Sequence, residues 1–78
     1  MAKAREDGTR SDRELFVYNL GWLLSQTNTG VDHIEYDDGE ESGYESAIVH
    51  YENGFTRRVC IEWDSYTGIM KDVLKEVA

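Results

Sequence analysis

Apolar residues recur with helical spacing near the start of the chain. The stretch Ser11-Asp12-Arg13-Glu14 matches a capping box, in which a serine caps a helix and a glutamate three residues later reaches back. The pattern predicts a helix from about Asp12 to Gln26, ended by the turn residues 28–30. The side chains within about 120° of its helical wheel are expected to contact the core. They are Phe16, Val17, Leu20, Leu23 and Leu24.

Gly21 interrupts this helix near its middle. A glycine inside a helix costs about 1 kcal/mol relative to alanine. We therefore expect a side chain or a stretch of backbone to lie so close to the helix that only glycine fits there.

Three strands are predicted in the middle of the chain. Residues 31–38 form the first, with Ile34 and Tyr36 on one face, and residues 44–52 and 55–63 form the other two. Asn-Gly at 53–54 separates the last two strands and favours a two-residue type I′ turn, because both positions of that turn need a positive φ.

This turn sets the register of the hairpin. A two-residue loop places six side chains on the core face: Tyr44, Ile48, Phe55, Val59, Ile61 and Trp63. The outer face then carries Glu45, Ala47, Val49, Tyr51, Thr56, Arg58, Cys60 and Glu62, with Glu45 opposite Glu62. A slip of one residue would exchange the two sets on one strand.

A final helix is predicted from Asp64-Ser65 to the end of the chain. Its apolar positions form one stripe: Ile69, Met70, Val73, Leu74 and Val77. The expected fold is therefore α+β, with a helix, a three-stranded antiparallel meander and a second helix in two layers, both helices on one face of the sheet. Residues 11–78 form a single domain, and residues 1–10 are expected to be a flexible tail.

Composition excludes several classes of function. The formal net charge of −8 argues against direct binding to nucleic acid or to an anionic membrane, since both need clustered cations. No apolar run reaches the length of a membrane span, and the single cysteine excludes an internal disulfide. We expect a cytoplasmic domain.

No catalytic or cofactor motif is visible, so we expect neither an enzyme nor a bound cofactor. The acid-rich stretch 37–45 does not match a calcium-binding loop, and His33, His50 and Cys60 lack ligand spacing. We expect no dedicated metal site, although weak binding of a divalent cation stays open.

The negative charge is concentrated in one segment. Acids and bases balance in residues 1–14 and in residues 53–78, and residues 15–31 carry no charge. The whole excess lies in residues 32–52, which contain no lysine or arginine. Such a block creates a local negative field, or it only keeps a loop solvated. The candidate binding acids are Asp32, Glu35, Asp37, Asp38, Glu40, Glu41 and Glu45.

The first helix carries a second apolar stripe outside its core face. Leu15, Tyr18 and Trp22 form it, at i, i+3 and i+7. Exposed large aromatics often mark partner surfaces, because they supply contact area at a low entropic cost. The alternative is that the tail or the second helix covers the stripe.

These exclusions leave protein binding as the expected function. Carboxylates at i and i+2 of a strand stand about 6.6 Å apart, and such a row can imitate the phosphates of a nucleic acid. The size, the acidity, the helix–three strands–helix layout and the acid-rich stretch from Asp37 to Glu45 resemble the small phage anti-CRISPR proteins that block a CRISPR effector by imitating DNA. The resemblance lies in architecture and charge, so it assigns no residue roles.

The resemblance implies an inhibitor from a phage or mobile element that occupies the positively charged DNA-recognition groove of a nucleic-acid-binding effector. A rival interpretation is a non-catalytic structural module that forms a homodimer through Leu15, Tyr18 and Trp22. In that case the acids serve only solubility.

Overall fold

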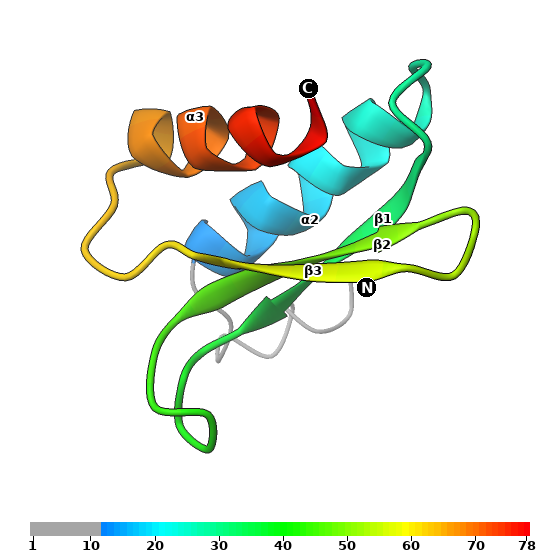
Figure 1. Cartoon of the computed structure of the whole chain (residues 1–78). Coiled ribbons are helices and arrows are strands. Elements are labelled where there is room, and N and C mark those ends of the chain that lie inside the picture. Colours follow the sequence, from blue (N-terminus) through cyan, green and yellow to red (C-terminus); the bar gives the residue numbers. More distant parts are fainter. Residues whose placement is uncertain (1–11) are drawn as a thin grey trace.

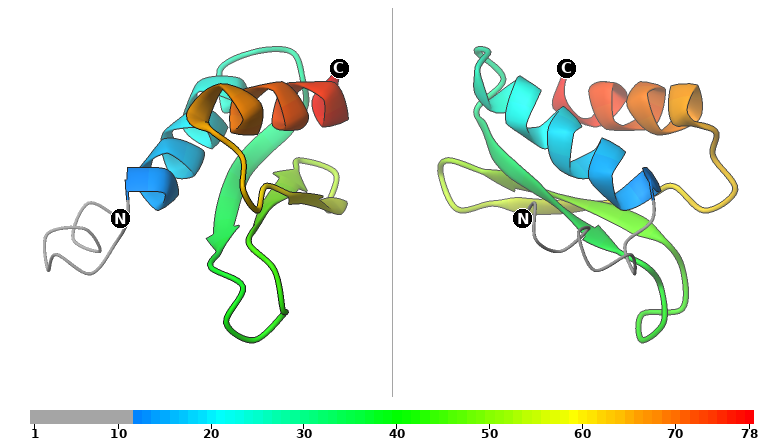
Figure 2. Two further views of the ribbon diagram at one scale, coloured as in Figure 1. Left: turned by 90° about the vertical axis from the view of Figure 1, so that its left-hand side faces the viewer. Right: turned by 180° about the vertical axis from the view of Figure 1, so that it is seen from behind.

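Two helices lie on one face of a three-stranded antiparallel sheet in the computed structural model, which describes residues 12–78 (Figures 1 and 2). The elements in chain order are α2 (Asp12–Ser25), β1 (Val31–Asp37), β2 (Ser46–Tyr51), β3 (Thr56–Cys60) and α3 (Tyr66–Val77). The sheet order is β1-β2-β3, so the predicted α+β meander is confirmed. The predicted cap Ser11 and the predicted tail 1–10 lie outside the described residues.

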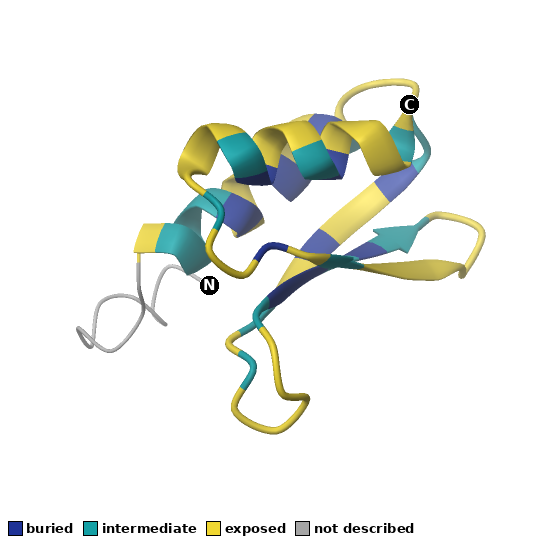
Figure 3. Ribbon diagram, turned by 60° about the vertical axis from the view of Figure 1, so that its left-hand side comes forward, coloured by how far each residue is buried: buried dark blue, intermediate teal, exposed yellow. Residues whose placement is uncertain are grey.

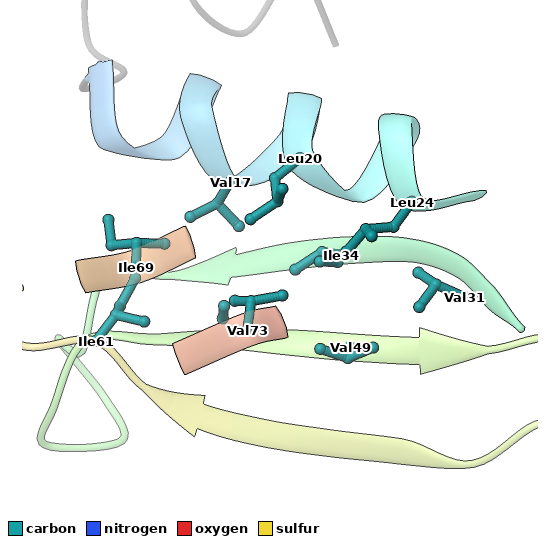
Figure 4. Packing of buried hydrophobic residues seen from close by; sticks show 10 residues of the cluster. Val17, Leu20, Leu24, Val31, Ile34, Val49, Ile61, Ile69 and Val73 are labelled. Carbon is teal, nitrogen blue, oxygen red and sulfur yellow. The ribbon is translucent and has the colours of Figure 1, made fainter. Parts of the chain in front are cut away.

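The core lies between the helices and the sheet. Helix α2 packs mainly on β1, and α3 packs on β3 and beside α2. The buried surfaces of both helices face the sheet (Figure 3), and their side chains meet those of the strands (Figure 4). The buried apolar residues are Val17, Leu20, Leu24, Val31, Ile34, Ala47, Val49, Ile61, Ile69 and Val73. No helix within residues 12–78 is long and apolar enough to cross a membrane.

The turn between β2 and β3 differs from the prediction. Its loop has three residues, 52–54, because the amide of Gly54 donates to the carbonyl of Tyr51 at 2.9 Å and the amide of Tyr51 donates to the carbonyl of Phe55 at 2.8 Å. Gly54 has a φ of 96°, as expected for the glycine that ends a three-residue hairpin loop. The predicted two-residue turn is therefore wrong by one residue.

The register follows from this loop. Ala47 pairs with Val59, and Val49 pairs with Arg57. Ala47 and Val49 are fully buried against the helices, although the predicted register placed them on the outer face. On β3 the predicted orientation is correct, because Val59 is half-buried against the core and Ile61 is fully buried.

Three aromatic residues assigned to the core are exposed. The exposed fraction is 36% for Tyr44, 68% for Phe55 and 93% for Trp63. Ile48 alternates with the buried Ala47 and Val49 and lies half-buried on the open face of the sheet. The wrong register accounts for Tyr44 and Ile48.

Helix α2 begins and ends close to the predicted residues, but its core face is narrower. Val17, Leu20 and Leu24 are buried as predicted, and Phe16 packs at the edge of the core. Leu23 is 57% exposed, so its assignment to the core is wrong. It lies about 100° around the helix from Leu24, beyond the stripe that touches the sheet.

The close approach of α2 to the sheet at Gly21 explains why the buried face of the helix is narrow. A Cβ atom built on Gly21 would stand 2.6 Å from the backbone nitrogen of Ile34 and 2.8 Å from its Cβ. Helix α2 thus lies almost in backbone contact with β1, and the predicted packing reason for this glycine is confirmed.

Helix α3 begins as predicted. The side chain of Ser65 caps it by accepting a hydrogen bond from the amide of Gly68 at 3.1 Å. Ile69 and Val73 are buried, whereas Met70 and Leu74 lie at the margin of the stripe and are partly exposed.

Candidate acidic binding surface

Glu45 is an interior residue rather than part of the outer face. Its Oε1 and Oε2 accept hydrogen bonds from Nη2 and Nε of Arg13 at 2.7 and 2.8 Å, and Oε2 also accepts one from the hydroxyl of Tyr36. Its side chain is only 13% exposed. The backbone of Glu45 bonds to Ile61, so the predicted pairing of Glu45 with Glu62 is wrong.

Arg13 holds several segments together at this point. Besides its two-pronged contact with Glu45, its guanidinium donates to the carbonyl of Ile61 at 2.9 Å and to that of Asp64. It therefore ties the first turn of α2 to the start of β2 and to the segment after β3. A planar guanidinium suits this task because its donors form a rigid fork.

This contact makes the stability of the domain depend on pH. The hydrogen bond from Arg13 lowers the pKa of Glu45 below its ordinary value. A carboxyl with a lowered pKa in the folded state stabilises the fold above its unfolded pKa, and that contribution is lost as the pH falls through the folded pKa. Asp64 has the opposite effect on the pH dependence of stability, because a hydrogen bond with Asp72 and burial raise its pKa.

We expect Glu45→Gln to reduce the free energy of unfolding at neutral pH and to flatten its decline in acid. The measurement is urea unfolding at several pH values from about 7 down to about 2.5. Asp32→Asn is the control, since the Asp32 side chain is 61% exposed and the same chemical change there should alter the free energy of unfolding at neutral pH by less than about 0.5 kcal/mol. Parallel profiles for the wild type and Glu45→Gln would contradict the assignment.

Two more of the candidate acids are paired on the open face of the sheet. Asp37 contacts Nη1 of Arg58 at 2.7 Å, and the same nitrogen donates to the hydroxyl of Ser46 at 2.6 Å. The Arg58 contact and a bond from the amide of Gly39 lower the pKa of Asp37. Glu35 lies 2.6 Å from Nε2 of His50.

Asp32 belongs to the same row of contacts. It lies 2.7 Å from Nδ1 of His33, whose ring stacks on the ring of His50 with the centroids 4.3 Å apart. The open face near β1 is thus a mixed surface of carboxylates and imidazoles rather than a continuous acidic row.

The loop between β1 and β2 carries three exposed carboxylates close together in the chain. Asp38, Glu40 and Glu41 are exposed there, and within residues 12–78 none of them forms an ion pair. We refer to residues 38–43 as the acidic loop. It borders an open hollow of about 590 Å³ lined by Glu35, Asp37, Asp38, Glu40, Glu41 and Arg58, among others.

Backbone contacts hold the acidic loop in one shape. The carboxylate of Asp38 accepts a hydrogen bond from the amide of Glu40 at 2.9 Å, and the amide of Gly43 donates to the carbonyl of Gly39 at 2.9 Å. Gly39 has a φ of 88°, and a Cβ there would stand 2.6 Å from the carbonyl carbon of Tyr44. The loop therefore presents its carboxylates from a defined backbone.

No group of three or more His, Cys, Asp or Glu side chains among the described residues is arranged to hold a metal ion. Cys60 is exposed at the end of β3. The acidic loop thus offers charge and hydrogen-bond acceptors, and the structure assigns it no metal chemistry.

The alternative interface on α2 is also accessible in part. Tyr18 is 40% exposed and Trp22 is 57% exposed, whereas Leu15 is half-buried. Helix α3 lies beside α2 (Figure 2), and the Trp22 side chain is not covered by it.

Trp63 is the most exposed of the residues that the sequence prediction placed in the core. The predicted hairpin extended β3 through this position and buried it, whereas β3 ends at Cys60 and the chain turns away before α3. The available signal was the predicted start of the final helix at Asp64-Ser65, because a strand that continued through Trp63 would leave no room for a turn before that helix.

Comparison with known proteins found no matching family model, no matching curated protein and no matching solved structure. The functional assignment therefore rests on the geometry and charge described above.

Proposed function

We propose that this chain is a small, non-catalytic protein-binding module that inserts its acidic loop into a basic groove of a partner. One observation carries the proposal. Asp38, Glu40 and Glu41 stay exposed and without an ion pair in the described part of the chain, whereas Asp37 and Glu45 are neutralised by arginines. The unpaired carboxylates are the ones a basic partner can reach.

The expected partner is a nucleic-acid-binding effector, and the module would act as its inhibitor. A groove that binds nucleic acid is lined with lysine and arginine, and a rigid loop with three carboxylates offers it a substitute for phosphates. The architecture and acidity that resemble phage anti-CRISPR proteins support this class of partner. Complementary charge would also accelerate the encounter, because it steers the two proteins together.

The proposal predicts a complex that weakens steeply with salt. The test begins with a partner captured from the native host at about 50 mM NaCl, which is then purified and titrated up to about 500 mM, where the Debye length is roughly threefold shorter. We expect the affinity to fall at least about tenfold over this range. Duplex DNA should compete with the module for the same groove.

A charge-matched pair of variants tests the position of the contact. Glu40→Gln with Glu41→Gln and the single change Glu52→Lys each raise the net charge by two, but Glu52 lies in the exposed β2–β3 turn. Only the loop variant should weaken the complex strongly. Equal losses of affinity in the two variants would show that net charge alone, and not the position of the carboxylates, determines binding. A complex whose affinity changes neither with salt nor in the loop variant would contradict the proposal.

The dimer remains the second candidate, because Trp22 and Leu23 are each 57% exposed on α2. It predicts a concentration-dependent mass in sedimentation experiments that Trp22→Ala abolishes. Hydrophobic contact is strengthened by sulfate, so this association should increase where the acidic complex weakens.

A further inference from the structure

Trp63 contributes almost nothing to the fold. Its exposed fraction is 93%, the highest among the large apolar residues of the described chain, and Phe55 follows with 68%. A tryptophan supplies its stabilising contacts through burial, so a residue this exposed adds little to folding stability. Aromatic residues left in water on a loop are instead the typical anchors of protein interfaces.

The backbone at Trp63 is also unfavourable for a bulky residue. The amide of Asp64 donates to the carbonyl of Ile61 at 3.0 Å, which closes a four-residue turn with Trp63 in third place. Trp63 has a φ of 70°, and it is the only non-glycine residue of the described chain with a positive φ. This matches a type II turn, whose third position favours glycine or asparagine. The fold thus holds an exposed indole at a position where smaller residues fit better.

Trp63 stands between two acidic residues of the chain, Glu62 and Asp64. The nearby guanidinium of Arg13, which donates to the carbonyl of Asp64, is already paired with Glu45. The amide of Ile61 donates to the carbonyl of Glu45 at 3.1 Å, so the segment after β3 runs beside the end of the β1–β2 connection. Both segments extend from the same end of the sheet (Figure 1). Glu62, the neighbour of Trp63, is exposed, and the acidic loop projects from this end.

We propose that Trp63 is the aromatic anchor of the acidic surface and that its indole stacks on an arginine side chain of the basic partner. This inference rests on the proposed function and adds to it the residue and the chemical group that meet. A guanidinium suits the site because it stacks on an aromatic ring and also pairs with carboxylates such as Glu62. Lysine shares the charge but stacks less well.

The test uses nona-arginine and nona-lysine peptides as defined probes. In the Trp22→Phe background Trp63 is the only tryptophan, so its fluorescence reports contact directly. We expect nona-arginine to change this emission more than nona-lysine does. Trp63→Asn should weaken the binding of nona-arginine about twofold to fivefold, the range of a cation–π contact near the surface.

Two controls accompany this measurement. Phe55→Asn removes an aromatic side chain that is 68% exposed in the β2–β3 turn, at the opposite end of the sheet, and should change the affinity less than twofold. Trp63→Asn should melt at or above the temperature of the wild type, because asparagine tolerates a positive φ. A loss of binding therefore cannot be attributed to unfolding.

The outcomes separate this inference from the proposed function. If Trp63→Asn binds nona-arginine like the wild type while Glu40→Gln with Glu41→Gln weakens it, Trp63 is not the anchor and the acidic loop still is the contact. If Trp63→Asn loses binding and the loop variant does not, Trp63 acts without the acidic loop, and the proposed function is wrong. Absence of binding to both peptides at about 50 mM NaCl, where screening is weak, overturns both.

Discussion

Replacing Arg13 by alanine is expected to lower the free energy of unfolding by about 3–5 kcal/mol, because it leaves a largely buried carboxylate without its partner. Glu45 would lose both hydrogen bonds from the guanidinium, and the carbonyls of Ile61 and Asp64 would each lose their hydrogen bond from Arg13. A domain of this length is stable by only about 4–12 kcal/mol, so the variant should be close to unfolding. Urea unfolding followed by circular dichroism measures the loss.

Arg57→Ala is the matched control for this change. Its Nε lies 3.6 Å from Glu76 and its side chain is 64% exposed, so its removal should cost less than about 0.5 kcal/mol. Adding Glu45→Gln to Arg13→Ala should restore part of the stability, since it removes the unpaired charge. Equal losses for Arg13→Ala and Arg57→Ala would show that the cluster around Glu45 does not hold the domain together.

The same cluster shows why the acidic surface could be predicted only in part. Counting charges along the chain correctly found a segment without lysine or arginine, from Asp32 to Glu52. The fold then brings Arg13 to Glu45 across 32 positions and Arg58 to Asp37 across 21. Such partners are invisible in a linear count, and they reduce the unpaired acids mainly to Asp38, Glu40 and Glu41.

The order and type of the elements followed from local signals. The helix from Asp12, the start of the final helix near Asp64-Ser65 and the three-stranded meander follow from patterns among neighbouring residues, and all are confirmed. The hairpin register was not determined locally. Asn53-Gly54 fits a two-residue turn and also the end of a three-residue loop, because both need a residue with a positive φ. Packing of the sheet against the helices determines that Ala47 and Val49 are the β2 residues buried in the core.

The errors of the core assignment bear on function. The hairpin register placed Trp63 in the core and the helical wheel placed Leu23 there, whereas the structure leaves both exposed. Neither is needed for the fold in that position. Failures of a sequence rule are expected mainly at functional or strained sites, and Trp63 is such a failure, with a positive φ as well.

For Gly21→Ala, two physical effects predict changes in stability of opposite sign. Helix propensity alone favours the alanine by about 1 kcal/mol. The new Cβ, however, would stand 2.6 Å from the backbone nitrogen of Ile34, so α2 must move away from β1. Overpacking of this kind costs about 1–3 kcal/mol or more, and here it disrupts the contact between the first helix and the sheet. We expect a net destabilisation, measured as a fall in melting temperature of about 10 °C.

Asn19→Ala on the exposed side of the same helix is the control, and it should leave the melting temperature unchanged or raise it slightly, since it changes propensity alone. Combining Gly21→Ala with Ile34→Ala should give no rescue. The two shortest contacts of the added Cβ are to the nitrogen and the Cβ of Ile34, which the second change retains. A Gly21→Ala protein that melts above the wild type would mean that α2 lies farther from β1 than this structure places it, and the narrow core face of Val17, Leu20 and Leu24 would then lose its explanation.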